Sequence, residues 1–407
     1  MGPAPHVPDP DAGSGAKAPR IAYVLTEFPA LTETFVTTEC TLLERRGIDV
    51  LPFSLRRPAH ASVGAEADGW RRRTGYAGLQ SPWSFGGSAV RRALAITTDH
   101  LRLAPVEGAF AARVLPAAAW IAERSRDVLH VHTHFERGAA ILASLVAALL
   151  DRPWSFTAHA FGVYLSAPRA LAYRCRHAAF VRVSHQSLGT RLRALAGAGT
   201  PIRTVLARTP LPAQFHVADA PSPLDPTVPL VVVARDVPKK GLLLLPDIAR
   251  ELRLLGHTPR IDVIGPVDVR APSWATDTIA RLGPLPHDAI RRRLSQATLS
   301  LLPCRIAPNG DRDGIPLSLL ESMAVGTPAV STRVGGIPEA YPGELQELLA
   351  APEDTVGIAR IVARILDSPG RRRDLAALGL DLVARDYGPS ALDPLVTAFM
   401  GRPAPVP

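Results

Sequence analysis

Cysteine is scarce in this chain: only Cys40, Cys175 and Cys304 occur among 407 residues. They form no Cys-x-x-Cys pair, so the sequence offers neither a paired-thiol redox motif nor a cysteine-based zinc pair. Their number is odd and no export signal precedes them, which favours reduced thiols in a cytoplasmic protein. Cys304 ends an apolar run, where a cysteine more often serves as a small buried hydrophobe than as a nucleophile.

Long apolar runs are absent as well. Residues 1–19 contain no apolar h-region and are not predicted to be a signal peptide. The longest apolar run, residues 138–150, is shorter than the about 20 residues that cross a bilayer, and it predicts a buried helix instead. Residues 1–19 and 402–407 are predicted to be loose tails. Together these features give the expectation of a cytoplasmic protein without a membrane span.

The positive charge of the chain is not accompanied by a nucleic-acid-binding module. The formal net charge is +9, and arginines cluster at residues 56–57, 71–73, 91–92, 291–293 and 371–373. No recognisable module or aromatic-rich strand goes with them, so we expect no nucleic-acid partner. Solvated helix faces are the ordinary explanation for such clusters. The alternative is peripheral contact with anionic lipid at the inner membrane face, where each Lys or Arg contributes about 1 kcal/mol.

What the chain does have is an alternation of strands and helices. It runs from Ile21 to about Leu206, stops at a Pro-rich segment, residues 216–229, and restarts at Leu230. This pattern predicts an α/β protein with two doubly wound domains, residues 20–215 and 230–385, joined by a linker. Within the first domain, residues 66–127 are predicted to form extra helices that hold a bulky or lipid-linked acceptor.

The most informative stretch is residues 309–328, in which seven residues separate Asp313 from Glu321. Pro316 suits the first position of a short helix and Gly326 suits its end. Asp313 is therefore expected just before the helix and Glu321 about one turn inside it. As a plain alternative, two acids near a helix start stabilise its dipole by about 0.3–1 kcal/mol and need no other role.

Two strand-like runs, residues 298–303 and 329–332, flank this predicted helix. The helix N-terminus is then expected at the carboxyl ends of parallel strands, where open α/β sheets bind ligands. Free N–H groups at such a place favour an anionic ligand such as a diphosphate.

A second motif begins with a buried strand rich in valine at residues 230–234 and continues to Arg235 and Lys240, with four residues between these two cations. Fixed cations at the end of a strand can neutralise the charge of a leaving nucleoside diphosphate without a metal ion. Preorganised charge of this kind lowers a barrier by about 3–4 kcal/mol per group. The alternative is a solvated basic turn, which is common for Lys-Lys-Gly.

Three histidines, His130, His132 and His134, alternate along another predicted strand and so share one face. A zinc site is not expected there, because the three lie in a line and no cysteine or acid cluster nearby supplies a fourth ligand. A further histidine, His159, follows a strand that ends at Thr157, in a loop above the sheet.

The residues from Glu321 to Val330, Glu-Ser-Met-Ala-Val-Gly-Thr-Pro-Ala-Val, resemble the hallmark of the retaining, nucleotide-sugar-dependent glycosyltransferases of family 4, which have the GT-B fold. Asp313 stands where that family has its first Glu. The same family carries an Arg, four residues and Lys-Gly about eighty residues earlier, as Arg235 and Lys240 do. The stretch 27–35 resembles the opening of a branch that acts in polysaccharide assembly of the colanic-acid type and in antibiotic-like sugar assembly. The similarity covers roughly residues 20–385.

This resemblance implies two Rossmann-like domains that face each other across a cleft, the first for the acceptor and the second for the nucleotide sugar. A last helix, within residues 386–407, is implied to cross back to the first domain. The implied reaction is metal-independent transfer of a sugar from a UDP- or GDP-linked donor to an acceptor hydroxyl, with retention of the anomeric configuration and without a cofactor. The acceptor is expected to be a carbohydrate, a lipid-linked molecule or a natural product.

The resemblance also assigns roles to residues. Arg235 and Lys240 would hold the diphosphate, Glu321 would accept the ribose hydroxyls, and Asp313 would contact the sugar. Further assignments are donation of a hydrogen bond to the sugar by His159, a backbone cradle at Gly335, Gly336 and Ile337, and an acceptor side at Thr32 and Glu33. Without the resemblance, Thr32 and Glu33 are an ordinary N-cap and first-turn acid of a helix.

Three departures from the family pattern support a different hypothesis, a catalytically impaired GT-B protein that activates another enzyme. They are Asp313, Gly162 where the family has Asp, and the lack of an Asn-Gly-Val-Asp segment after His185. The intact Arg235, Lys240 and Glu321 favour an enzyme. Residues 311–313 also read Asp-x-Asp, the metal motif of the other glycosyltransferase fold, but they lie too late in the chain for that role, so no metal site is expected.

Overall fold

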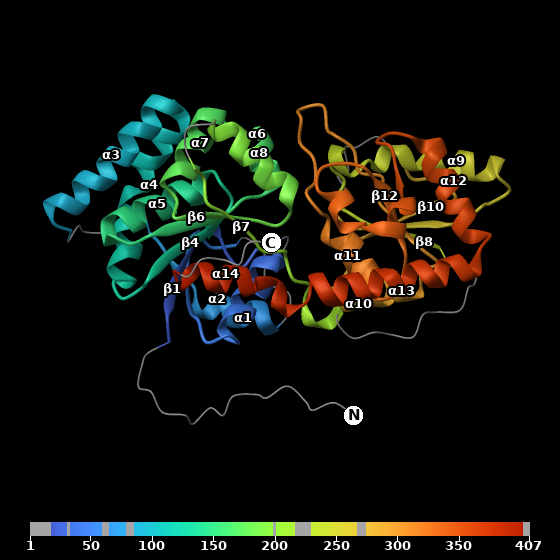
Figure 1. Ribbon diagram of the computed structural model, residues 1–407, viewed down its shortest axis with the longest axis horizontal. Coiled ribbons are helices and arrows are strands. Elements are labelled where there is room, and N and C mark those ends of the chain that lie inside the picture. The colour runs from blue at the N-terminus through green and yellow to red at the C-terminus, as the bar shows by residue number, and fades with distance from the viewer. Residues whose placement is uncertain are drawn as a thin grey trace, which may run out of the picture.

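The computed structural model describes residues 18–30, 33–58, 65–78, 85–197, 201–215, 229–266 and 274–401. Two lobes lie side by side in Figure 1, one coloured blue to green and the other yellow to red. Each lobe contains one parallel β-sheet with helices packed against it. Thr32 and the linker residues 216–228 lie outside the described residues.

The first sheet has seven parallel strands in the order β3-β2-β1-β4-β5-β6-β7. Their bounds are β1 Arg20–Glu27, β2 Asp49–Arg56, β3 Gly75–Tyr76, β4 His130–His134, β5 Trp154–Thr157, β6 Phe180–Val183 and β7 Thr204–Leu206. Residues 21–25 of β1 are at most 2% exposed, as expected for a strand that is covered on both faces. The strand order reverses between β1 and β4, and such a switch point is where sheets of this type bind ligands.

Eight α-helices belong to the described part of the first domain. They are α1 Thr34–Glu44, α2 Ala65–Arg73, α3 Gly87–Leu103, α4 Pro105–Arg124, α5 Gly138–Leu150, α6 Ala160–Leu165, α7 Pro168–His177 and α8 Gln186–Ala196. The apolar run 138–150 is a buried helix, α5, as predicted. The predicted cap of α1 was wrong: a turn closed by Glu33 N–H and the Ala30 carbonyl, 3.1 Å apart, makes Glu33 the N-cap residue, so the helix begins at Thr34.

The second sheet has six parallel strands in the equivalent order, β10-β9-β8-β11-β12-β13. Its strands are β8 Leu230–Val233, β9 Ile261–Ile264, β10 Ile279–Gly283, β11 Ser300–Leu301, β12 Ala329–Thr332 and β13 Leu349–Ala350. Its α-helices are α9 Leu245–Leu254, α10 His287–Gln296, α11 Leu317–Ala324, α12 Thr355–Leu366 and α13 Pro369–Asp386. The switch point lies between β8 and β11.

The unit around α11 differs from the prediction in two details. The strand expected at residues 298–303 pairs only at Ser300 and Leu301. Pro316 is the N-cap residue of α11 and not its first helical residue, because its ψ of 126° is extended. Gly326, with φ of 77°, does end the helix, since its left-handed conformation suits glycine.

After α13 the chain returns to the first domain. The 3₁₀ turn Pro389–Leu392 and the helix α14 Asp393–Phe399, red in Figure 1, lie against the blue lobe. Arg46, just after α1, donates to the Pro389 carbonyl at 2.5 Å and to the Asp393 carboxylate at 3.0 Å. Near this return, the N–H of Leu211 donates to the carbonyl of Tyr387 at 3.0 Å, so the two segments that connect the lobes are bonded to each other.

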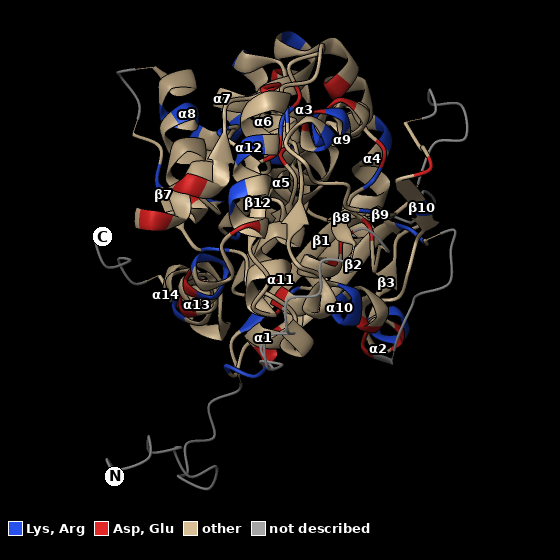
Figure 2. Cartoon of the chain, turned by 90° about the vertical axis from the view of Figure 1, so that its right-hand side faces the viewer, with Lys and Arg blue, Asp and Glu red and all other residues tan. Residues whose placement is uncertain are grey.

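The arginine clusters lie on separate helices and several are paired with acids. Arg293 of α10 lies 3.3 Å from Asp262, and Arg371 of α13 lies 2.8 Å from Glu347. Blue basic and red acidic segments alternate over the face in Figure 2. Among the described residues, no helix combines the length and apolarity that a membrane crossing needs. Peripheral membrane contact therefore stays a prediction.

Candidate functional site

The diphosphate-binding pair of the sequence prediction follows β8. Arg235 comes two residues after the strand. Its side chain is exposed and has no hydrogen-bond or ion-pair partner in the described part of the chain. A short 3₁₀ turn, Pro238–Lys240, then leads to Gly241, whose φ is 69°. A side chain at Gly241 would overlap the carbonyl oxygen of Pro303, so glycine allows this turn to approach the loop after β11.

Lys240 and Asp313, from different loops, form an ion pair with 2.9 Å between Nζ and Oδ2. Lys239 adds a second cation, 3.6 Å from Asp313 and 3.2 Å from Asp311. Burial opposes ionisation of both partners, yet their attraction prevails: the pKa of Asp313 is lowered by Lys240 and Lys239, and the pKa of Lys240 is raised by Asp313. The Cys304 thiol lies 3.5 Å from Asp313 Oδ2, so this cysteine supports the pair.

Glu321 lies one turn inside α11, as predicted. Its carboxylate is partly buried and has no hydrogen-bond or ion-pair partner among the described residues. Burial raises its pKa to about 7, so the group is only partly ionised at neutral pH. An acid kept without a protein partner is available to accept hydrogen bonds from a ligand.

The glycine loop after β12 packs closely on Asp313. Gly335 has a φ of 56°, and a side chain there would overlap the Asp313 carbonyl oxygen. The N–H of Gly336 donates to the Gly314 carbonyl at 3.1 Å, and that of Ile337 donates to the Val334 carbonyl at 3.0 Å. Of the three N–H groups proposed as a cradle, only that of Gly335 lacks an acceptor in the described structure.

His159 stands at the N-terminus of α6, and its backbone N–H donates to the Glu136 Oε2 atom at 3.0 Å. A side chain at Gly162 would overlap this Glu136 carboxylate. Glu136 therefore fills the volume of the acid that the family carries three residues after the histidine. Burial raises the pKa of Glu136 to about 7. No motif indicated this residue, because it comes from the loop after β4.

The first domain docks on the glycine loop through α8. Glu339 accepts hydrogen bonds from the N–H groups of Gln186 and Ser187, at 2.6 and 2.8 Å. Burial opposes ionisation, but His185 and these N–H groups lower the pKa of Glu339 to about 2. The His185 ring, 3% exposed, lies so close that a Cβ atom on Gly336 would come within 2.7 Å of it. No sequence motif indicated this interdomain contact.

Further contacts bring the two strand-end faces together. Arg312 stacks on the Tyr164 ring, with 4.2 Å from its guanidinium carbon to the ring centroid. Burial and the Glu27 carboxylate raise the pKa of Glu33 to about 7, and Arg235 of the other domain acts in the opposite direction. Glu33 and Arg235 thus interact electrostatically across the two domains. We use the name interdomain site for the following set: Glu33, His159, Arg235, Lys240, Asp313 and Glu321.

Two groups of residues resemble metal sites. Ligand atoms of Glu39, His132 and His134 lie within 4.8 Å of one another. Glu39 is, however, already paired with the Arg182 guanidinium at 2.5 Å, and no described residue offers a fourth ligand. Asp311 and Asp313 of the Asp-x-Asp sequence face Lys239 and Lys240 instead. In both groups a protein cation takes the place next to the carboxylate.

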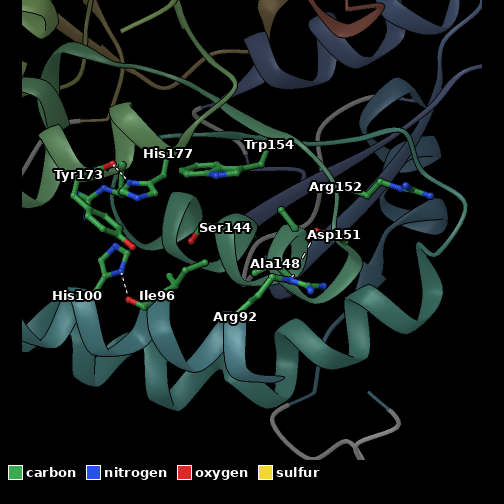
Figure 3. Close-up of a pocket in the computed structure, with 12 residues that line it drawn as sticks. Arg92, Ile96, His100, Ser144, Ala148, Asp151, Arg152, Trp154, Tyr173 and His177 are labelled. Atoms are coloured by element: carbon green, nitrogen blue, oxygen red, sulfur yellow. Dashed lines mark hydrogen bonds and ion pairs between the residues drawn. The ribbon is translucent and has the colours of Figure 1, made fainter. Parts of the chain in front are cut away.

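A separate cavity of about 170 Å³ lies in the first domain between α3, α5 and α7. Figure 3 shows His100, Tyr173 and Trp154 among its lining residues, with Arg92 and Asp151 at another side. None of the residues of the interdomain site lines this cavity. It is therefore a feature of the first domain alone.

Comparison with known proteins assigns the second domain. Residues 228–368 match the family model described as "Glycosyl transferases group 1". This region of the second domain is therefore similar to group 1 glycosyltransferases. The matched region contains all four second-domain residues of the interdomain site, which are Arg235, Lys240, Asp313 and Glu321.

Curated relatives agree with this assignment. One similar protein is the amylovoran biosynthesis glycosyltransferase AmsK of Erwinia amylovora, 34% identical over 143 residues, which are 33% of this chain and 35% of that protein. Another is the putative colanic acid biosynthesis glycosyltransferase WcaL of Escherichia coli, 33% identical over 147 residues, 34% and 36% of the two chains. The chain thus spans about a third of the length of these relatives. A longer match, 25% over 295 residues, 64% of this chain and 74% of the other, joins it to the 2-deoxystreptamine glucosyltransferase of Streptomyces kanamyceticus.

Solved structures cover both lobes. Sucrose-phosphate synthase from Thermosynechococcus elongatus aligns with a TM-score of 0.68 at 17% identity, over 94% of this chain and 98% of that one. HepE of Anabaena, in complex with UDP and glucose, aligns with a TM-score of 0.67 at 14% identity, over 94% and 99%. At such identities the likeness shows the fold alone. The prediction of an α/β fold of the GT-B type, with two Rossmann-like domains, is confirmed.

Proposed function

We propose that this protein is a retaining, metal-independent glycosyltransferase of family 4 that transfers a sugar from a UDP- or GDP-linked donor to an acceptor hydroxyl. The observation that carries the proposal is the ion pair of Lys240 with Asp313, which joins the loop after β8 to the loop after β11 at the carboxyl edge of the second sheet. The names of the relatives AmsK and WcaL, both glycosyltransferases, support it.

The diphosphate is held by cations of two kinds. The Arg235 side chain is exposed and has no hydrogen-bond or ion-pair partner among the described residues, and its planar guanidinium suits two phosphate oxygens at once. Lys240 approaches from the adjacent turn as a point charge that Asp313 holds in position, 2.9 Å away. As the bond to the sugar breaks, both cations stabilise the charge that grows on the leaving diphosphate.

The two acids of the second domain take the hydroxyl groups of the donor. The Glu321 carboxylate has two oxygens and no partner in the part of the chain that the structure describes, so it accepts both ribose hydroxyls. Asp313 already receives Lys240 on one oxygen and contacts a hydroxyl of the sugar with its remaining acceptor capacity. The free N–H of Gly335, beside Asp313, is the remaining backbone donor of the cradle.

The protein needs no metal ion and no strong base in this proposal. Lys239 and Lys240 supply the positive charge at Asp311 and Asp313 that a divalent cation supplies elsewhere. The leaving phosphate takes the proton of the acceptor hydroxyl on the same face of the sugar, which gives retention. The acceptor, a carbohydrate, a lipid-linked molecule or a natural product, binds on the first-domain side at Thr32 and Glu33.

Purified full-length protein incubated with a panel of UDP- and GDP-sugars tests the proposal through release of nucleoside diphosphate. Lys240→Ala is expected to lower kcat by about a hundredfold or more, corresponding to about 3 kcal/mol. Arg250→Ala, at an exposed site on α9, serves as the matched control and should turn over like the wild type. Addition of EDTA should leave the rate unchanged. Equal rates for wild type and Lys240→Ala would remove the enzyme interpretation and leave the impaired-protein hypothesis.

A further inference from the structure

A chain of hydrogen bonds runs from His159 into the core of the first domain. The His159 Nε2 atom lies 3.2 Å from His134 Nδ1, and His134 Nε2 lies 3.1 Å from Glu39 Oε1. Glu39 and His134 are 0% exposed, whereas His159 is only partly buried. The chain therefore joins a carboxylate in the core to a side chain that borders the interdomain site.

Two more groups complete the surroundings of Glu39. The Tyr23 hydroxyl donates to Oε1 at 2.7 Å, and the Arg182 guanidinium donates to Oε2 at 2.5 Å. Burial raises the pKa of Tyr23 well above its usual value, so this phenol is neutral. Burial opposes ionisation of Glu39 too, but Arg182 and His134 hold the pKa of that carboxyl well below its usual range. The cluster thus contains one negatively charged carboxylate and one positively charged guanidinium, and these two charges cancel.

Burial and hydrogen bonding restrict the histidines of this cluster. His134 has no solvent contact, and its two ring nitrogens face the Glu39 carboxylate and the His159 ring. Burial likewise lowers the pKa of His132 and of His159 well below the usual value. His132 is occupied by the hydroxyls of Ser155 and Thr157, at 2.7 and 3.1 Å, and takes no part in the chain to His159. His132 and His159 are therefore neutral, and each carries one N–H.

The positions of these protons follow from Glu39. An ionised carboxylate only accepts hydrogen bonds, so the proton of His134 is on Nε2, facing Glu39. The Nδ1 atom of His134 then bears a lone pair, and the bond to His159 forms only if His159 Nε2 carries the proton. The Nδ1 atom of His159 is left unprotonated, and no described residue donates to it.

We propose that Glu39 is a positioning residue which, through His134, fixes the tautomer of His159, so that this side chain accepts a hydrogen bond from a substrate hydroxyl. The resemblance to family 4 implied the opposite direction, donation by His159 to the sugar. An acceptor atom at this position selects a ligand group with a proton, such as a sugar or acceptor hydroxyl, and disfavours a phosphate or carboxylate oxygen. The identity of the ligand rests on the proposed function, but the tautomer does not.

Nitrogen-15 NMR of histidine-labelled, full-length protein tests the tautomer directly. Long-range proton–nitrogen correlations at pH 7 distinguish the protonated from the bare ring nitrogen, and His159→Gln identifies the signals by their loss. We expect a proton on Nε2 and a bare Nδ1 in the wild type. A proton on Nδ1, or a doubly protonated ring, would overturn the proposal. This result is obtained whether or not the protein turns over a nucleotide sugar, so it fails or succeeds separately from the proposed function.

Kinetics test the role of Glu39. Glu39→Gln keeps the shape of the side chain but can donate to His134, so we expect both tautomers of His159 and a kcat lower by about ten- to a hundredfold, with little change in KM for the donor. In a His159→Ala background the same substitution should have no further effect on kcat, because its influence passes through His159. A full additional loss in that background would contradict the proposal.

Donor analogues cover the case in which Glu39→Gln does not fold. Sugars with one hydroxyl replaced by hydrogen or by fluorine are compared in the wild type and in His159→Ala. At the hydroxyl that bonds His159, the deoxy and the fluorinated sugar should lower the transfer rate of the wild type equally, because neither substituent can donate a hydrogen bond. In His159→Ala neither replacement should change the rate. If the fluorinated sugar keeps the rate that the deoxy sugar loses, His159 is a donor and the inference is wrong.

Discussion

Lys240 and Asp313 belong to loops more than 70 residues apart in sequence, yet Lys240 Nζ and Asp313 Oδ2 lie 2.9 Å apart in the folded protein. The cation proposed for the diphosphate is thus held by the acid proposed for the sugar. Each partner is more ionised because of the other, as their pKa shifts show. When the donor binds, the Asp313 carboxylate must therefore accept hydrogen bonds from both the Lys240 ammonium group and a sugar hydroxyl.

Asp313→Asn tests this sharing. The change frees the ammonium group of Lys240, while Lys239 keeps its pair with Asp311, so we expect tighter binding of nucleoside diphosphate by calorimetry and a lower kcat. Loss of the pair should also lower the free energy of unfolding by about 1–3 kcal/mol, since the partly buried Lys240 loses its carboxylate partner. Asp313→Glu, which restores the family residue, should keep activity and serves as the control. Weaker diphosphate binding in Asp313→Asn would contradict the interpretation.

Gly336→Ala tests the contact between the domains. The backbone of Gly336, with φ of −88°, accepts alanine, so the only obstacle is the His185 ring, 2.7 Å from the new Cβ atom. Overpacking of this kind costs about 1–3 kcal/mol, and we expect a lower melting temperature and weaker donor binding. Gly370→Ala, where no atom lies within 4 Å, is the matched control. Addition of His185→Ala to Gly336→Ala should restore donor affinity, and its failure to do so would rule out this clash as the cause.

The pH dependence of ligand binding should report on Glu321. Its pKa of about 7 in the free protein falls when ribose hydroxyls bond the carboxylate, so binding releases a proton. We expect affinity for nucleoside diphosphate to rise as the pH increases from 6 to 8, by up to about tenfold per unit below the pKa. Calorimetry in two buffers of different ionisation enthalpy measures the proton. Glu321→Gln should give a flat profile, and an unchanged slope in that variant would assign the proton elsewhere.

Glu339 should make stability depend on pH in the acid range. Its pKa is lowered from 4.5 to about 2, so its contribution is present above pH 4.5 and is lost as the pH falls toward 2. Melting temperatures of wild type and Glu339→Gln should differ at pH 7 and converge as the pH is lowered through this window. A constant difference at all pH values would mean that the ionised carboxylate is not what stabilises the α8 contact.

The sequence predicted the parts of the site that depend on local order. Arg235 and Glu321 could be placed because each follows or begins a regular element, and the end of a parallel strand fixes where the next residue lies. Glu136 could not be anticipated, since it replaces an acid at Gly162 by filling the same volume from another loop. Glu339 and His185 were missed for a similar reason: a contact between residues about 150 positions apart leaves no local pattern. The predicted start of α1 was wrong by one residue because the turn at Ala30 makes Glu33 the N-cap.

The bond between Leu211 and Tyr387 joins the outward and return passages of the polypeptide at one place. Two domains joined by one polypeptide segment can rotate about any axis. Two adjacent segments that are bonded to each other restrict the domains to rotation about one hinge axis. Opening of the two domains is then a rotation about this hinge axis, and the distance between Glu33 and Arg235 changes with that single rotation. Removal of residues 388–401 would eliminate the connection that returns to the first domain and permit rotation about further axes. Small-angle scattering can detect this change as a broader distribution of distances between the lobes.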